Sequence, residues 1–363
     1  KRSRWRETGA EPMLMRGRSP VRILDLGGWP GAPEAGQGAA LSACGALFSH
    51  CILRRRANGI GTPVGEESML RHRNQYAPVL RASAHSGCSE TAEVCESEHA
   101  RCLDLLHAAA RHLGVDAGLE ADIWTDVAPG CGLGVSAATN SAVVAALVAM
   151  AGQHSPPRAV ARLAHLLEDE IGDGPAPAPD HYASAVGGIS FSEIEHGQVK
   201  AERLSPASGF VHELEERLVL VNVGQPRSDA DVRRRATRRI AAGHGDAVPA
   251  AAALRDAAWA GKHSILRGDM VGLADAINAN WAAQKRACPD ATTDAIEACF
   301  DAAMLAGAMA GKASGAGGGG TAVFLTQPGA ELRVREALSG LPRCTLLPSS
   351  VCCEGVRSWP ARG

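Results

Sequence analysis

The sequence predicts a fold of two mixed domains, α/β in the first half of the chain and α+β in the second, with a cleft between them. Its 363 residues, 45% of them hydrophobic, exceed the roughly 250–300 residues at which a single core usually stops growing. A strand, a glycine-rich loop and an apolar helix follow one another over 123–150, and a new series of elements begins near Arg217. We therefore place an N-terminal domain over 18–205 and a C-terminal domain over 206–355.

In the first domain, short apolar runs that end at glycine or proline predict strands, and leucine and alanine at helical spacing predict helices. The expected strands cover 19–26, 38–54, 123–127 and 187–193. The expected helices cover 98–113, 139–150 and 158–171. A loop with three prolines follows the last helix, because proline cannot continue a helix.

The second domain is expected to begin with an apolar strand after a loop-like stretch near Ser205, and to continue with long helices. The expected strands cover 217–223, 321–325 and 344–348. The expected helices cover 229–242, 250–267, 270–285, 292–310 and 330–338. This order is typical of a sheet with helices on one face.

The composition favours a small-molecule partner over a nucleic acid or a membrane. The 37 basic and 39 acidic residues nearly balance, so no net charge attracts the chain to a polyanion or an anionic membrane. No apolar run approaches the roughly 20 residues that span a bilayer, and we expect a soluble, cytoplasmic protein. Eleven cysteines without zinc-type pairing indicate free thiols in a reducing compartment. The oligomeric state stays open, with a homodimer as the assembly considered.

The strongest motif is the loop that precedes the helix at 139–150. Three of its residues are glycines, which let a ligand approach the backbone closely, and the turn directs free N–H groups to a helix N-terminus, where phosphate binds favourably. It has neither the Gly-Lys-Ser/Thr ending of a Walker A loop nor a Rossmann fingerprint, and an ordinary strand-to-helix turn is the alternative. The residues expected to hold a triphosphate are Pro129, Gly130, Cys131, Gly132, Leu133, Gly134, Val135 and Ser136.

A second glycine-rich segment, 311–320, is expected in the other domain between a helix and a strand. By composition alone it is also compatible with a flexible hairpin. Together with the first loop, however, it resembles the motifs of the GHMP kinases, the family of galactokinase, homoserine kinase, mevalonate kinase and phosphomevalonate kinase. In that family the first loop cradles the phosphates of ATP. The present chain departs from the family at Val135, where a serine is usual.

The resemblance implies a GHMP-kinase-like fold, with an N-terminal nucleotide-binding domain and a ferredoxin-like C-terminal domain. It also implies that the second loop closes over the phosphates and the substrate. The residues of that loop expected to contact substrate are Gly315, Ala316, Gly317 and Gly318.

The segment 18–29 resembles the N-terminal motif of the same family, and its Gly-Gly-Trp ending is similar to the L-fucokinase and D-glycero-D-manno-heptose 7-phosphate kinase branches. We therefore expect Gly28 and Trp29 to contact the substrate. Those branches continue with Ser or Thr and then an Asp that helps to hold the sugar. Here Pro30 and Gly31 follow, so that aspartate is absent.

The segment 179–188 resembles the Asp-Gln-Tyr-Ala-Ala-Ala-Phe-Gly-Gly stretch of the sugar kinases, which makes Asp180 the candidate that orients or deprotonates the acceptor hydroxyl. His181 replaces the glutamine and is expected to hydrogen-bond the substrate. Arg22 is the candidate that stabilises charge near the transferred group, with a structural ion pair as the alternative. Ser136 and Glu168 are expected to bind Mg²⁺, although Glu168 is also compatible with a solvated helix face.

These motifs predict an ATP-dependent kinase that phosphorylates a hydroxyl of a sugar or sugar phosphate, with the anomeric hydroxyl of a heptose 7-phosphate as the specific expectation. Two alternatives stay open. One is a GHMP kinase that acts on a mevalonate-like or amino-acid alcohol. The other is a nucleotide-binding paralogue without catalysis, for which Val135, His181 and the missing aspartate after Trp29 are the arguments.

Overall fold

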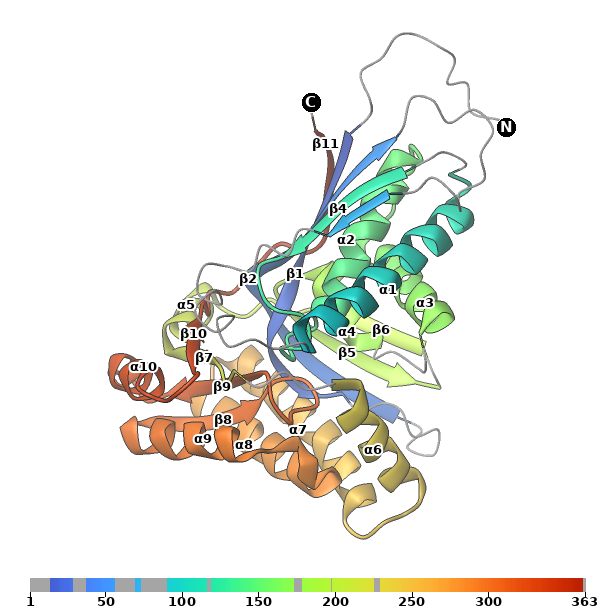
Figure 1. The fold of residues 1–363 in the computed structure, drawn as a ribbon. Helices are drawn as coiled ribbons and strands as arrows, with labels where there is room; N and C mark the ends of the chain where they lie inside the picture. Colours follow the sequence, from blue (N-terminus) through green and yellow to red (C-terminus); the bar gives the residue numbers. More distant parts are fainter. Residues whose placement is uncertain are drawn as a thin grey trace.

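The computed structural model describes residues 14–28, 37–55, 69–72, 90–115, 119–172, 178–196, 198–224 and 229–361. They form two sheets with helices packed on them (Figure 1). In the larger sheet the strand order is β11-β1-β2-β4-β3, and β5 and β6 extend it from β2. In the smaller sheet the order is β10-β7-β9-β8, with antiparallel pairing throughout. The mixed two-domain α/β and α+β fold predicted from the sequence is thus confirmed.

A long antiparallel hairpin, β1 (Leu14–Gly27) and β2 (Gln37–Arg55), forms the centre of the larger sheet. One end of β2 pairs with β4 (Leu119–Thr125) and the other end with β5 (Ile189–Glu195). Because β2 changes partner along its length, one strand connects two parts of the sheet. The remaining strands are β3 (Met69–His72), β6 (Gln198–Arg203) and β11 (Arg357–Ala361).

Four helices cover the larger sheet (Figure 1): α1 (Glu90–Leu113), α2 (Val135–Met150), α3 (Pro157–Ile171) and α4 (Ala178–Val186). Nearly all side chains of α2 are buried, because this helix lies between the sheet and its neighbouring helices. The sequence pattern missed α4, since the prolines before it indicated a loop. Proline is tolerated in the first turn of a helix, and Pro179 lies there.

The second half of the chain forms the smaller sheet and six further α-helices among its described residues. The strands are β7 (Leu218–Asn222), β8 (Ala308–Ala313), β9 (Thr321–Thr326) and β10 (Thr345–Leu347). The α-helices are α5 (Ser208–Arg217), α6 (Asp229–Ala241), α7 (Ala247–Arg267), α8 (Met270–Ala287), α9 (Asp294–Ala306) and α10 (Glu331–Ser339). A short 3₁₀ helix, Pro289–Ala291, lies between α8 and α9.

Two expectations about this half were wrong. The helix predicted over 292–310 ends at Ala306, because Gly307 adopts a left-handed conformation (φ 114°) that terminates it. The residues that follow form β8. The second glycine-rich segment therefore joins two antiparallel strands, β8 and β9, and does not lie between a helix and a strand.

The two sheets share one hydrophobic core. Val21 and Ile23 of β1 belong to the same buried cluster as Leu220 of β7, Ile265 of α7 and Ile277 of α8. The end of the chain also returns to the first half, where β11 pairs with the beginning of β1 and the N–H of Cys352 donates to the carbonyl of Cys44 at 2.8 Å. The hairpin is therefore held at the beginning of β1 and at Cys44 of β2 by residues from the end of the chain.

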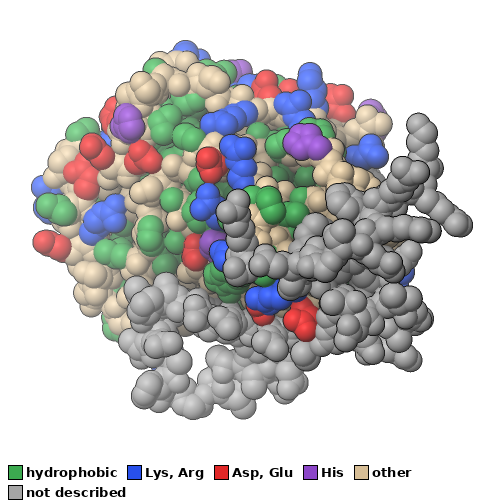
Figure 2. All heavy atoms as spheres, turned by 90° about the horizontal axis from the view of Figure 1, so that it is seen from above, with side chains coloured by type: hydrophobic (Ala, Val, Ile, Leu, Met, Phe, Trp, Pro, Cys, Tyr) green, Lys and Arg blue, Asp and Glu red, His purple; other side chains and the backbone are tan. Residues whose placement is uncertain are grey.

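On the face shown in Figure 2, basic, acidic and apolar side chains are interspersed over the described residues. Within the described ranges, none of the helices combines the length and the apolar character that a membrane crossing requires.

The two glycine-rich loops touch each other through their backbones. A Cβ placed on Gly132 would lie 2.7 Å from the carbonyl oxygen of Ser314, and one placed on Gly320 would lie 2.5 Å from that of Cys131. Both glycines have positive φ, which further favours glycine. The absence of side chains at these positions is what allows the loops to meet.

Replacing Gly320 by alanine therefore tests the loop contact. We expect Gly320→Ala to lower the free energy of unfolding by about 2–4 kcal/mol, from left-handed strain and overlap with the Cys131 carbonyl. Gly329→Ala is the matched control, since Gly329 has a similar φ of 78° but open space around it, and strain alone costs about 1–2 kcal/mol. Urea-induced unfolding of both variants measures the difference, and equal losses would contradict the contact.

Candidate active site

The loop at 129–134 connects β4 to the N-terminus of α2. Gly134, with a left-handed conformation (φ 70°), is the N-cap residue, and no acidic residue lies in the first turn of the helix. A helix N-terminus carries partial positive charge and N–H donors, so it favours an anion. The side chain of Ser136 is exposed here, whereas that of Val135 is buried in the core. This geometry is compatible with a bound phosphate.

A β-bulge in β1 places two charged side chains on one side of the strand. In a regular strand, residues three apart point to opposite faces. Between Arg22 and Leu24, however, β1 has one residue more than β2, and this irregularity changes the alternation. As a result, Nη1 of Arg22 lies 3.2 Å from Oδ1 of Asp25.

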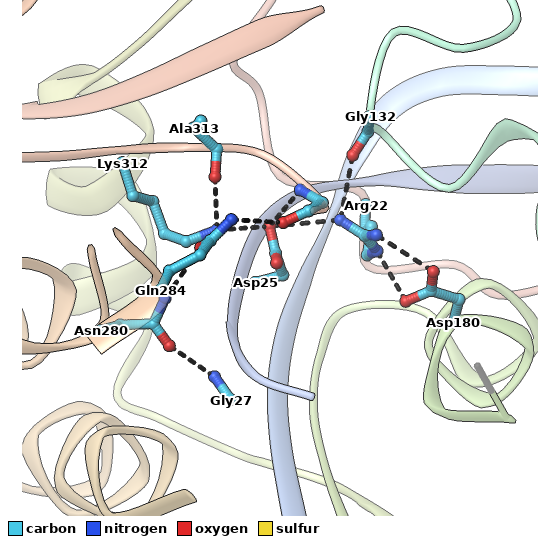
Figure 3. A network of polar contacts seen from close by, with 10 residues as sticks. Arg22, Asp25, Gly27, Gly132, Asp180, Asn280, Gln284, Lys312 and Ala313 are labelled. Atoms are coloured by element: carbon cyan, nitrogen blue, oxygen red, sulfur yellow. Dashed lines mark hydrogen bonds and ion pairs between the residues drawn. The ribbon is translucent and has the colours of Figure 1, made fainter. Parts of the chain in front are cut away.

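Arg22 links strand β1, the first glycine loop and helix α4. Its Nε and Nη2 donate to the two carboxylate oxygens of Asp180, at 2.7 and 3.0 Å, in a bidentate pair (Figure 3). Its Nη1 donates to the carbonyl of Gly132 at 3.1 Å, and its backbone N–H donates to that of Leu133. A bidentate pair fixes direction as well as distance, so the Asp180 carboxylate is held in one orientation.

Asp25 receives its other contacts from the second half of the chain. Nζ of Lys312, a fully buried residue of β8, lies 3.0 Å from Oδ1 of Asp25, and the N–H of Gly315 donates to the same oxygen at 3.3 Å. Burial alone raises the pKa of Asp25, but the positive charges of Lys312 and Arg22 outweigh that effect and lower it. Asp25 is therefore ionised at neutral pH.

Two amide side chains of α8 hold the loops on either side of this network (Figure 3). Asn280 Oδ1 accepts a hydrogen bond from the N–H of Gly27 at 2.7 Å, and Gln284 Nε2 donates to the carbonyl of Gly315 at 2.9 Å. The two amides also contact each other, at 3.4 Å. Both are buried, so they form a polar connection across the interior between the end of β1 and the loop after β8.

These elements surround a cavity. Arg22 and Asp180 line it, as do Gly28, Gly315 and Ala316 among the residues predicted to contact substrate. Trp29 lies outside the described residues. The other lining residues are Asp25, Leu26, Gly27, Ala40, Ser42, Pro179 and Arg233.

Three predicted substrate residues do not line this cavity. The N–H of Gly318 donates to the carbonyl of Ala291 at 2.5 Å, and a Cβ on Gly317 would lie 2.3 Å from that same oxygen. These two glycines thus anchor the loop on the 3₁₀ helix. His181 is fully buried, with Nε2 2.6 Å from Oε2 of Glu168.

Glu168 and Ser136, the predicted metal ligands, are in direct contact. The Ser136 hydroxyl donates to Oε1 of Glu168 at 2.5 Å, and Arg101 Nη2 donates to the same oxygen at 3.1 Å. Burial raises the pKa of Glu168, but contacts with His181, Ser136 and Arg101 outweigh it and lower the pKa to about 2. Glu168 is thus a buried, ionised carboxylate, which excludes the solvated-face alternative.

Sequence reasoning assigned no role to Asp25, Lys312, Asn280, Gln284 or Arg233. An available signal was the position of Asp25 and Lys312, since each is a charged residue directly between two apolar or small residues of the sequence. A second signal was the spacing of Asn280 and Gln284, since residues four apart lie on the same face of a helix. Arg233 is one of several arginines in α6, and the sequence does not distinguish it from the others.

Two family models match this chain. The model for the GHMP kinases N terminal domain matches residues 99–188, and the model for GHMP kinases C terminal matches residues 262–342.

Three known proteins illustrate the similarity. The D-glycero-alpha-D-manno-heptose 7-phosphate kinase of Campylobacter jejuni is 28% identical over 237 residues, 65% of this chain and 69% of that protein. The bifunctional fucokinase/GDP-fucose pyrophosphorylase of Arabidopsis thaliana is 25% identical over 213 residues, 58% of this chain and 20% of that longer protein. The structure of a D-glycero-D-manno-heptose 1-phosphate kinase from Bacteroides thetaiotaomicron matches the fold with a TM-score of 0.71 at 20% identity, covering 96% of this chain and 100% of that one.

The lowered pKa of Glu168 predicts a pH-dependent stability. Its folded-state pKa of about 2 lies below the ordinary value of 4.5, so its ionised contacts stabilise the fold above about pH 4.5 and are lost as the pH falls towards 2. The loss is on the order of 3 kcal/mol. In Glu168→Gln, the free energy of unfolding should be lower at neutral pH and change less between pH 5 and pH 3.

Urea titrations at several pH values, without metal or nucleotide, measure this difference. Glu170→Gln is the control, since Glu170 is an exposed carboxylate on the same helix, with only a 3.8 Å ion pair to Arg111. A Glu168→Gln curve parallel to that of the unaltered protein would contradict the lowered pKa.

Proposed function

This chain belongs to the GHMP kinase family, and we propose that it transfers the γ-phosphoryl group of ATP to a hydroxyl group of a sugar or sugar phosphate. The observation that carries the proposal is the bidentate pair between Arg22 and Asp180. It lies in the wall of a cavity that residues from both halves of the chain line. Phosphoryl transfer depends on positioning and on neutralisation of charge, and this pair offers both.

In this proposal, Asp180 accepts a hydrogen bond from the acceptor hydroxyl and takes its proton as the oxygen bonds to the γ-phosphorus of ATP. The bond between that phosphorus and the bridging β–γ oxygen breaks, and ADP leaves. Arg22 keeps the carboxylate directed at that hydroxyl, and its positive charge offsets negative charge on the transferred group. Since Arg22 also donates to the carbonyl of Gly132, the loop proposed to hold the phosphates and the proposed base share one guanidinium.

The loop at 129–136 fits the phosphates of ATP. Gly132 and Gly134 have positive φ and leave the backbone accessible, and α2 begins directly after them without an acidic side chain in its first turn. Glu168 and the Ser136 hydroxyl provide two adjacent oxygens, which suits Mg²⁺, a cation that prefers oxygen ligands and retains several of its waters. A bound Mg²⁺ would supply positive charge to the phosphates.

A heptose phosphate is the acceptor we favour, with phosphorylation at its anomeric hydroxyl. The support is the similarity to the Campylobacter jejuni heptose 7-phosphate kinase and the Gly-Gly-Trp sequence at 27–29. Four charged side chains and Ser42 are among the residues that line the cavity, and these groups are suited to hydrogen bonds with a ligand rich in hydroxyl groups.

A panel of acceptors tests the proposal directly. ADP formation is measured with free sugars, with sugar phosphates that include heptose 7-phosphates, and with mevalonate and homoserine as non-sugar alcohols. We expect turnover with at least one sugar phosphate. Turnover only with mevalonate or homoserine, or ATP binding without any turnover, would overturn the proposal.

Removal of the charge on Asp180 should slow the chemical step. Asp180→Asn keeps the shape of the side chain but cannot accept a proton, so we expect kcat to fall by about 100-fold or more, the scale of general acid–base groups. The affinity for ATP should barely change, because Asp180 contacts Arg22 and not the glycine loop itself. Steady-state kinetics and nucleotide titration measure both quantities, and a variant with most of its activity would remove Asp180 as the base.

Replacement of Ser136 should weaken the use of Mg²⁺. In Ser136→Ala one proposed oxygen ligand is lost, so the Mg²⁺ concentration for half-maximal turnover should rise by about tenfold or more. Ser141→Ala is a matched control on the same helix, since the Ser141 hydroxyl is buried without a hydrogen-bond partner among the described residues. An unchanged Mg²⁺ dependence in Ser136→Ala would contradict the assignment.

A further inference from the structure

The contacts of Asp25 are concentrated on one of its two carboxylate oxygens. Arg22 Nη1 at 3.2 Å, Lys312 Nζ at 3.0 Å and the N–H of Gly315 at 3.3 Å all reach Oδ1 (Figure 3). Three donors, from β1, from β8 and from the loop after β8, therefore meet at this carboxylate. Together they hold the Asp25 side chain in one orientation.

The same side chain lines the cavity that Asp180 lines. Asp25 retains 17% exposure of its side chain, although Lys312 beside it is fully buried. A ligand in the cavity is therefore able to reach this carboxylate. Its fixed orientation, set by three donors on Oδ1, makes it a pre-organised acceptor.

This chain lacks an aspartate that the resemblance to the sugar kinases would predict after Trp29. In the sugar kinase branches that the N-terminal motif resembles, an aspartate two residues after Gly-Gly-Trp helps to hold the sugar, and here Gly31 is found instead. Asp25 lies four residues before Trp29, and the bulge in β1 turns it towards Arg22. A carboxylate is thus present at the acceptor cavity, but from a different position in the chain.

We propose that Asp25 is a substrate-binding residue, whose carboxylate accepts a hydrogen bond from a hydroxyl of the sugar other than the one that is phosphorylated. This inference rests on the proposed function, since it assumes that the acceptor occupies this cavity. It differs from the role of Asp180, which contacts the reacting hydroxyl.

The charge of Asp25 selects the kind of group that it binds. An ionised carboxylate accepts hydrogen bonds and repels a phosphate, so the phosphate of a sugar phosphate must lie elsewhere in the cavity. Arg22 and Lys312 offset the negative charge, which keeps the carboxylate from attracting a cation strongly. A neutral hydroxyl donor is the partner that satisfies these conditions.

A purely structural role for Asp25 makes a different prediction. If Asp25 only compensates the charge of Lys312, its loss alters stability and affects all substrates alike. If the Asp25 carboxylate binds a hydroxyl, its loss weakens the use of acceptors that carry that hydroxyl and leaves the corresponding deoxy analogue nearly unaffected. The two roles are therefore separated by kinetics with deoxygenated acceptors.

The experiment combines Asp25→Asn with a series of monodeoxy analogues of the acceptor found in the panel. In the unaltered enzyme, one monodeoxy analogue should lose about 10- to 100-fold in kcat/KM, as expected for a hydrogen bond to a charged group. With the full acceptor, kcat/KM of Asp25→Asn should be lower than that of the unaltered enzyme by a similar factor, mainly because KM for the acceptor rises. In this variant, replacing the full acceptor by the same analogue should lower kcat/KM by less than about threefold. KM for ATP should stay within about twofold.

Asp122→Asn is the matched control, since Asp122 is also a buried strand aspartate of the larger sheet paired with an arginine, Arg54, at 2.6 Å, but does not line the cavity. In Asp122→Asn, the same analogue should lower kcat/KM by as much as it does in the unaltered enzyme. The inference is overturned if every analogue lowers kcat/KM by the same factor in Asp25→Asn as in the unaltered enzyme. It is also overturned if no analogue lowers kcat/KM of the unaltered enzyme. The second measurement needs no variant, so it is able to overturn the inference even if Asp25→Asn does not fold.

The two proposals fail in different ways. Without turnover of any sugar or sugar phosphate, the proposed function fails and the role of Asp25 fails with it. With turnover but without a position-specific coupling to Asp25, only the role of Asp25 is lost.

Discussion

The buried ammonium group of Lys312 is the constraint on which the arrangement of the site depends. Lys312 is fully buried, and an unpaired charge in a protein interior costs several kcal/mol. Its anionic partner, Asp25, comes from strand β1, nearly 300 residues earlier in the chain. The charge of the C-terminal half is thus compensated only when β8 lies against β1, which requires the two halves to meet at this point.

The pair of Lys312 and Asp25 is the first part of a chain of four side chains with alternating positive and negative charge. Lys312 contacts Asp25, Asp25 contacts Arg22, and Arg22 forms the bidentate pair with Asp180. Each charge holds the next one in place, and the four charges sum to zero. The orientation of the proposed base therefore depends on a lysine that lies on the other sheet and does not line the cavity itself. Val21 and Ile23, which flank Arg22 in β1, are buried in the core that both sheets contribute to.

Much of the fold was predictable because its signals are local. Glycine after a strand and small residues before a helix indicated the loop at 129–134, and the structure has α2 beginning directly after it. The prediction failed where tertiary contacts decide. Prolines indicated a loop before Asp180, yet α4 starts at Ala178 and places Asp180 in its first turn. The apolar run after Thr292 read as one helix, because only the conformation of Gly307 separates α9 from β8.

The site was predictable only in part, for a similar reason. Arg22, Asp180 and the glycine loops occur in motifs, and the structure brings all of them to one place. Asp25 was not singled out because strand alternation puts it on the opposite face from Arg22. A bulge of one residue reverses that expectation, and such an irregularity in pairing leaves no clear mark in the sequence.

The departures from the family motifs bear on whether the chain is an active kinase or a nucleotide-binding relative without catalysis. Val135 is buried in the core, so the valine removes no exposed hydroxyl from the loop, and the next residue, Ser136, presents one. His181 contacts Glu168 and does not line the cavity. The aspartate after Trp29 is missing, but Asp25 provides a carboxylate in the wall of the cavity. Each departure thus has a local explanation that keeps Arg22 and Asp180 paired, and this favours catalysis over its loss.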